Sequence, residues 1–156
     1  MTYELILRWM HILGACTLLG TGAGIAFFML MAHRSGKAEI IAHTAGVVVA
    51  ADTIFTLSAV IIQPITGYFL AREIGWSLGE KWLVFSVILY VVTGICWLPV
   101  VWIQIKLRDL ARKAIATSTD LTESYFRLFR IWFLLGIPAF FAVLTIVWLM
   151  LSRPVW

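Results

Sequence analysis

Four long apolar stretches alternate with short polar segments along the chain. The apolar stretches cover residues 5–32, 40–71, 82–105 and 125–151. Each is longer than the roughly 20 residues that a helix needs to cross about 30 Å of hydrocarbon. Inside hydrocarbon such a segment must pair its own backbone N–H and C=O groups, which a helix does. The pattern predicts four transmembrane helices, over about 5–33, 39–72, 78–113 and 121–151, in a single domain covering residues 1–156.

Short polar segments mark where the predicted helices end. Gly36 follows the first helix and Gly75 follows the second. Ser77 and Glu80 have the spacing of a capping box, which predicts that the third helix begins near Leu78. Connections this short make neighbouring helices antiparallel. We therefore expect an all-α, integral membrane four-helix bundle with up-down-up-down topology.

The composition agrees with a membrane location and the charges predict an orientation. Hydrophobic residues make up 62% of the chain and charged residues 13%, which is too little polar surface to coat a soluble domain. Lys and Arg accumulate in cytoplasmic loops. Most of the 12 lie beside the first and third loops: Arg34, Lys37, Lys106, Arg108, Arg112, Lys113, Arg127 and Arg130. We therefore expect both termini outside (N-out, C-out), and the net charge of +4, being an orientation signal, implies no nucleic-acid partner.

Polar residues within the predicted spans are the candidates for function, because they are costly in hydrocarbon. At a rise of about 1.5 Å per residue, His11, Gln63 and Lys81 reach a similar height near the outer end of the bundle. Gly14 and Gly22 share one helix face with His11. This stripe of small residues leaves a slot that a flat macrocycle or a neighbouring helix could fill.

Histidine is the commonest protein ligand of haem iron, so His11 is a candidate axial ligand. Lys81 is the donor nearest to it in height, and an amine that has lost its proton can bind iron. The pattern favours a haem b site with His11 and Lys81 as metal ligands and with Gly14, Gly22 and Gln63 around the cofactor. Two alternatives stay open: His11 as a hydrogen-bonding interfacial residue, and Lys81 as an anchor that extends to the headgroups.

Three further ionisable residues are candidates of a different kind. Asp52 lies near the middle of the second predicted helix. It either forms hydrogen bonds with nearby Ser or Thr, or serves as a proton relay or substrate site. His33 and His43 flank the basic first loop, where they are either interfacial residues or part of a second site.

The whole chain resembles an uncharacterised bacterial family of predicted four-helix integral membrane proteins. Five segments carry the resemblance: WMHILG at 9–14, QPITG at 63–67, CWLPVVW at 96–102, QIKLRDL at 104–110 and RIWFLLGIP at 130–138. It implies a multi-pass protein of the bacterial cytoplasmic (inner) membrane. The family brings no established activity.

The layout also looks like that of HemJ, a membrane protoporphyrinogen oxidase family thought to hold haem b between a histidine of helix 1 and a lysine of helix 3. His11 and His33 fall where HemJ has its helix 1 histidines, and Lys81 falls at the start of helix 3. The resemblance implies a haem b site with His11 and Lys81 as its ligands. Where HemJ has an Asn-Glu pair before the helix 4 proline, this chain has Leu135 and Gly136.

Three hypotheses follow from these observations. The first is a HemJ-like haem b-binding membrane protein that passes electrons between a hydrophobic donor and a quinone or respiratory-chain partner. The second is a transporter or proton-coupled carrier centred on Asp52, which with four helices would have to form a homo-oligomer. The third is a non-catalytic subunit of a larger membrane complex.

Overall fold

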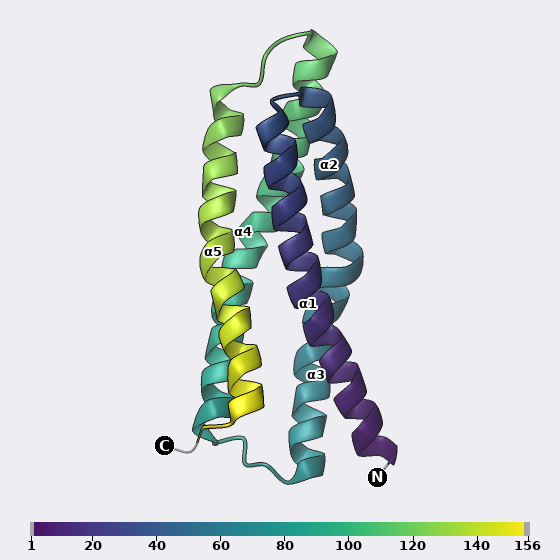
Figure 1. The fold of residues 1–156 in the computed structure, drawn as a ribbon, viewed down its shortest axis with the longest axis vertical. Coiled ribbons are helices and arrows are strands. Elements are labelled where there is room, and N and C mark those ends of the chain that lie inside the picture. Colours follow the sequence, from purple (N-terminus) through teal and green to yellow (C-terminus); the bar gives the residue numbers. More distant parts are fainter. Residues whose placement is uncertain (1, 155–156) are drawn as a thin grey trace.

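The structure is a computed structural model that describes residues 2–154, and all its regular elements are helices (Figure 1). They are α1 (Thr2–Ser35), α2 (Ala38–Ala51), the π-helical segment η1 (Asp52–Thr56), α3 (Leu57–Ile74), α4 (Lys81–Thr117) and α5 (Glu123–Ser152). Because α2, η1 and α3 form one continuous helix, residues 2–154 contain four helices long and apolar enough to cross a membrane. This confirms the predicted all-α four-helix fold.

Glycines and a late helix start define the turns. Gly36 and Gly75 have φ of 66° and 81°, a left-handed conformation that costs glycine little. After α3 the Trp76 N–H donates to the Ala71 carbonyl at 2.9 Å, which closes a Schellman-type end. The capping-box prediction is wrong: α4 begins at Lys81, and the Ser77 hydroxyl instead accepts the Gly79 N–H at 3.2 Å.

The bundle is tightly packed in one half and parted in the other. The chain termini and residues 75–80 lie at one end, called here the termini end, and residues 36–37 and 118–122 lie at the loop end (Figure 1). In the loop-end half, α1, α2, α4 and α5 share a core of buried residues that includes Met29, Ile41, Leu107 and Phe129. Toward the termini end α1 packs on α3, and α4 packs on α5. Among the described residues, α3 has almost no close contact with α4 or α5.

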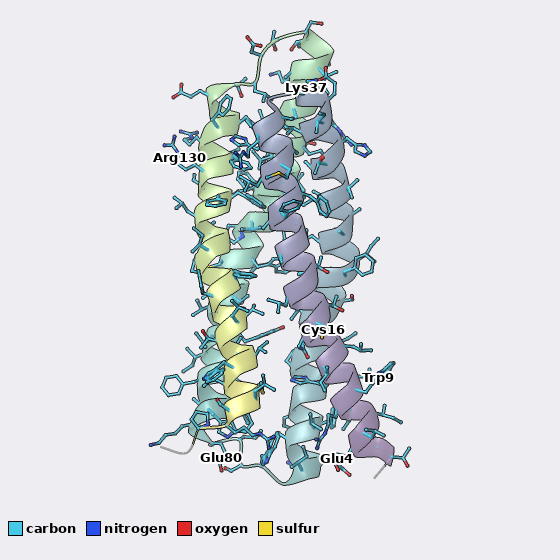
Figure 2. The ribbon with its side chains drawn as sticks, in the orientation of Figure 1. Glu4, Trp9, Cys16, Lys37, Glu80 and Arg130 are labelled. Atoms are coloured by element: carbon cyan, nitrogen blue, oxygen red, sulfur yellow. The ribbon has the colours of Figure 1, made fainter. Side chains whose placement is uncertain are left out.

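The outer surface of the bundle is apolar over its middle and charged at its ends. Figure 2 shows Lys37 at the loop end and Glu4 and Glu80 at the termini end. Between them large apolar side chains are exposed, such as Leu134 and Phe141. A helix surface of this kind is stable in contact with lipid chains, so the bilayer is the solvent of this protein.

Candidate functional site

A cavity of about 770 Å³ lies between the α1–α3 pair and the α4–α5 pair. Its walls are mostly apolar, and its polar groups sit at two levels. His11 and Gln63 line it toward the termini end, whereas Asp52 and Gln104 line it farther from that end, at the deep level. From Asp52 to Gln63 the helix advances about 16 Å, at 1.5 Å per residue. The cavity is therefore long as well as large.

At the termini-end level α1 and α3 fit into each other through two glycines. The His11 ring of α1 lies over Gly67 of α3, so that a Cβ at Gly67 would come within 3.0 Å of His11 Cε1. In the opposite direction, the Gln63 side chain of α3 lies over Gly14 of α1, where a Cβ would come within 3.2 Å of Gln63 Oε1. The space beside Gly14, predicted to receive a cofactor, is therefore filled by Gln63.

A hydrogen bond fixes the His11 ring. Its Nδ1 lies 3.0 Å from Thr66 Oγ1. The Thr66 hydroxyl already donates to the Ile62 carbonyl, at 2.9 Å, so toward His11 it accepts. Nδ1 therefore carries the proton, and Nε2 of the neutral ring has the lone pair.

Gln63 is buried, and its side-chain amide is not fully hydrogen-bonded. The residue is 8% exposed, and within residues 2–154 its Oε1 has no hydrogen-bond partner. A buried acceptor left unpaired costs roughly 1–3 kcal/mol. Because Gln63 also lines the cavity, this level has an unused hydrogen-bonding group beside the His11 imidazole.

The deeper level is a hydrogen-bonded network around Asp52, which is 3% exposed. Trp97 Nε1 of α4 donates to Asp52 Oδ1 at 3.2 Å. Trp132 Nε1 of α5 can only donate, which orients the Gln104 amide with Oε1 toward Trp132, at 3.3 Å. Gln104 Nε2 then donates to Asp52 Oδ2 at 3.0 Å. The network ties η1, α4 and α5 together.

Two local irregularities shape the helix that carries Asp52 and Gln63. The π segment begins at Asp52, where the helix leaves α4: α2 packs on α4 and α3 does not. Pro64 has no N–H, so the Val60 carbonyl four residues earlier loses its intrahelical donor. The Tyr90 hydroxyl of α4 donates to that carbonyl instead. This hydrogen bond joins α3 to α4 across the cavity.

Sequence reasoning placed some candidates in the cavity and missed others. His11, Gly22, Gln63 and Asp52 all line it. Lys81 does not, because it is exposed at the first residue of α4. The missed cavity residues are Trp97, Gln104, Trp132 and Tyr90. Thr66, which bonds to His11, was missed as well. In the sequence these side chains are indistinguishable from ordinary aromatic packing residues or isolated polar residues of a helix. A glutamine inside an apolar span was nevertheless a signal that could have found Gln104.

The other two histidines lie away from the cavity. His33 stacks on Phe129 with ring centroids 3.7 Å apart, and its Nδ1 lies 3.1 Å from the buried Tyr125 hydroxyl. His43 is exposed. Within residues 2–154, no group of three or more His, Cys, Asp or Glu side chains could hold a metal ion.

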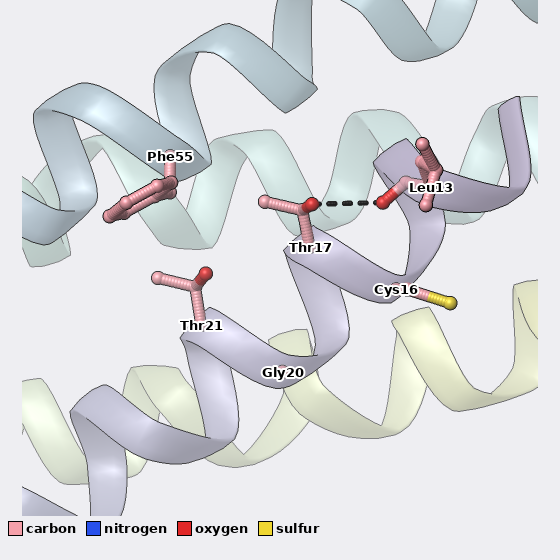
Figure 3. A pocket seen from close by; sticks show the side chains of 6 residues that line it. All are labelled: Leu13, Cys16, Thr17, Gly20, Thr21 and Phe55. Atoms are coloured by element: carbon pink, nitrogen blue, oxygen red, sulfur yellow. Dashed lines mark hydrogen bonds between the residues drawn. The ribbon is translucent and has the colours of Figure 1, made fainter. Parts of the chain in front are cut away.

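A second, open hollow of about 420 Å³ lies on the outside of α1. Figure 3 shows Thr17 and Thr21 directed toward Phe55, with the Cys16 sulfur pointing away. The Thr17 hydroxyl donates to the Leu13 carbonyl of its own helix at 2.8 Å. The hollow is shallow and open, and the Thr17 hydroxyl in it is already bonded within α1, so it is a weaker candidate than the cavity.

Four membrane-length helices around an intramembrane cavity define the class: a small multi-pass integral membrane protein. The family model for a predicted integral membrane protein (DUF2269) matches residues 5–154, and the chain belongs to this family. Searches of curated proteins and of solved structures gave no significant match.

Proposed function

We propose that this protein binds a lipid-soluble small molecule in the cavity between its two helix pairs. The observation that carries the proposal is the cavity itself, about 770 Å³ of mostly apolar space with two separate polar levels. Ligand sites commonly have volumes of about 300–1,000 Å³, apolar walls and a few placed polar groups. The apolar body of the ligand would lie along the walls, and its polar groups would meet His11 and Gln63 or Asp52.

Haem b is the cofactor for which the termini-end level offers a ligand. The hydrogen bond of His11 Nδ1 to Thr66 leaves Nε2 to bind iron, and such a bond on the other ring nitrogen is usual for metal-bound histidine. Haem, when bound, supplies a one-electron couple, which suits transfer between a hydrophobic donor and a quinone or respiratory-chain partner. Because Lys81 does not line the cavity, we retain His11 and leave the lysine out.

The visible spectrum of the full chain, purified in mild detergent and titrated with haem, tests this assignment. We expect a Soret band characteristic of histidine-bound haem. It should disappear in His11→Ala and persist in His33→Ala, because His33 does not line the cavity. Circular dichroism controls for folding of both variants. A folded wild-type protein that takes up no haem would exclude haem b and leave the broader cavity proposal to other lipid-soluble ligands.

A proton-coupled carrier is the second candidate, and the burial of Asp52 inside the cavity favours it. A carrier built from four helices per chain would work as a homo-oligomer, in which two cavities alternate between the membrane faces. In proteoliposomes, Asp52→Asn should abolish uptake of the lipid-soluble substrate while leaving any His11-dependent Soret band intact. Asp109→Asn, at a half-exposed aspartate paired with Arg108, is the matched control. Equal uptake by the two variants would exclude a carrier centred on Asp52.

A further inference from the structure

The deep level of the cavity holds a carboxyl group that receives hydrogen bonds from fixed donors. An indole N–H can only donate, so Trp97 points a donor at Asp52 Oδ1, and Trp132 orients the Gln104 amide so that its N–H meets Oδ2. Both oxygens of Asp52 therefore act as acceptors. Hydrogen bonds of this direction stabilise the ionised carboxylate relative to the neutral acid.

This carboxyl group has no counter-charge from the protein. Within residues 2–154 Asp52 forms no ion pair, and no Lys or Arg is among the described residues that line the cavity. The other titratable side chains in the lining are His11, Tyr68 and Tyr90. An ionised carboxylate in an apolar interior is costly unless a cation accompanies it. Asp52 is therefore a buried carboxylate whose positive partner would have to come from a ligand.

The surrounding walls have the chemistry that an organic cation needs. Trp97 and Trp132 line the cavity together with Phe133. Aromatic faces attract cations, and the attraction is stronger where water is excluded. Gly22 and Gly136 also line the cavity, and a Cβ added at either would meet nothing within 4 Å. There is thus open space beside aromatic and apolar walls for a bulky group.

We propose that the deep end of the cavity binds the positively charged group of a lipophilic organic cation, such as a substituted ammonium, against the carboxylate of Asp52. The apolar part of the ligand extends along the cavity toward the termini end. This inference rests on the cavity being a ligand site, as proposed above, and it does not depend on haem. It gives the carrier hypothesis a substrate class.

Equilibrium binding of radiolabelled tetraphenylphosphonium to the full chain in detergent tests the inference. We expect saturable binding that is roughly 10- to 100-fold weaker in Asp52→Asn, because one partner of a buried charge pair is lost. Asp109→Asn should bind as the wild type does. Triphenylphosphine oxide, a neutral probe with similar phenyl groups, should bind no more weakly to Asp52→Asn than to the wild type.

The wild-type protein alone provides a second measurement, which does not depend on whether Asp52→Asn folds. A cation and a proton compete for the same carboxylate, so tetraphenylphosphonium should bind more tightly as pH rises and then reach a plateau. A Cβ added at Gly136 would meet nothing within 4 Å, so the larger side chain of Gly136→Leu should take up cavity space and weaken binding of both probes. Binding of the cation that is independent of both pH and Asp52 overturns the inference. If the neutral probe alone binds saturably, the cavity proposal stands and the cation site falls; if neither binds, both fall.

Discussion

At the contact between α1 and α3, each helix has a glycine where the other presents a polar side chain. His11 rests on Gly67, and Gln63 rests on Gly14. The two glycines let a histidine and a glutamine sit between closely packed helices, with the His11 ring oriented by Thr66. The small residues of the first helix therefore serve polar packing at Gly14, whereas Gly22 opens on the cavity.

Gly67→Ala should destabilise the protein by about 1–3 kcal/mol, the usual cost of forcing extra volume into a packed site. The added Cβ would lie 3.0 Å from His11 Cε1, and the ring is held by its hydrogen bond to Thr66. Gly20→Ala is the matched control, since its Cβ meets nothing within 4 Å. Unfolding in mixed micelles with added denaturing detergent, followed by circular dichroism, measures both. A Gly67 variant as stable as the control would contradict this packing.

The Gln104 amide should be the most sensitive member of the deep network. Gln104→Leu leaves Asp52 Oδ2 and Trp132 Nε1 without their partners, each costing about 1–3 kcal/mol. Adding Trp132→Phe should recover part of the loss, because it removes the orphaned donor. Thr145→Val, which affects only a bond within α5, should stay within about 0.5 kcal/mol of the wild type. The same unfolding assay decides, and no recovery in the double variant would argue against the assigned amide orientation.

Residue depth was predictable from the sequence, but side-chain direction was only partly so. Counting along helices correctly put His11 and Gln63 at one height and Asp52 deeper. Lys81 does not line the cavity, because helix phase, as well as height, decides which side chains face inward. In the first turns of α4 the buried positions are Trp82 and Ser86, and this phase leaves the lysine outside.

At the scale of elements, the continuous helix from Ala38 to Ile74 is interrupted twice in ways that serve the cavity. The π segment lies where the helix separates from α4, and it starts at the residue that reaches back to α4. Pro64 frees a carbonyl that α4 then binds through Tyr90. The sequence shows a proline that would kink the helix, but the Tyr90 hydroxyl that binds the freed carbonyl comes from a distant segment and could not be predicted.

A double-mutant cycle tests this link between Pro64 and Tyr90. Tyr90→Phe should cost about 1 kcal/mol or more, because it orphans the Val60 carbonyl. In Pro64→Ala the restored N–H bonds that carbonyl within α3, so Tyr90→Phe should cost less there. The expected coupling energy is about 0.5–3 kcal/mol. The same cycle with Pro99→Ala should give none, and equal coupling in both cycles would refute the explanation.

The helix ends were the least predictable feature at this scale. The four spans were located correctly, and the third helix was expected to run past its apolar stretch, but α4 covers Lys81–Thr117 where 78–113 was predicted. Ser77 had the spacing of a helix cap, but in the tight turn at 75–80 its hydroxyl accepts a hydrogen bond from the Gly79 N–H instead. A hydrogen bond within a turn and a helix-capping hydrogen bond compete for the same side chain, and sequence spacing alone does not show which of the two forms.

For the whole molecule, the charge distribution predicts that the loop end faces the cytoplasm. In a Cys16→Ser and Cys96→Ser background, Gly79→Cys at the termini end should react with a membrane-impermeant maleimide on intact cells. Thr119→Cys at the loop end should react only after the cells are opened. The reverse pattern would invert the orientation, while the fold and the cavity would be unchanged.

The separation of the two helix pairs toward the termini end has a consequence for any binding measurement. Since α3 hardly touches α4 or α5 among the described residues, we expect lipid tails to reach the apolar walls between them. Occupancy is then an exchange, in which an incoming molecule displaces an acyl chain. The apparent affinity for a ligand should consequently vary with the length and unsaturation of the surrounding lipid chains. Binding constants measured in short-chain detergent and in native membrane should therefore differ.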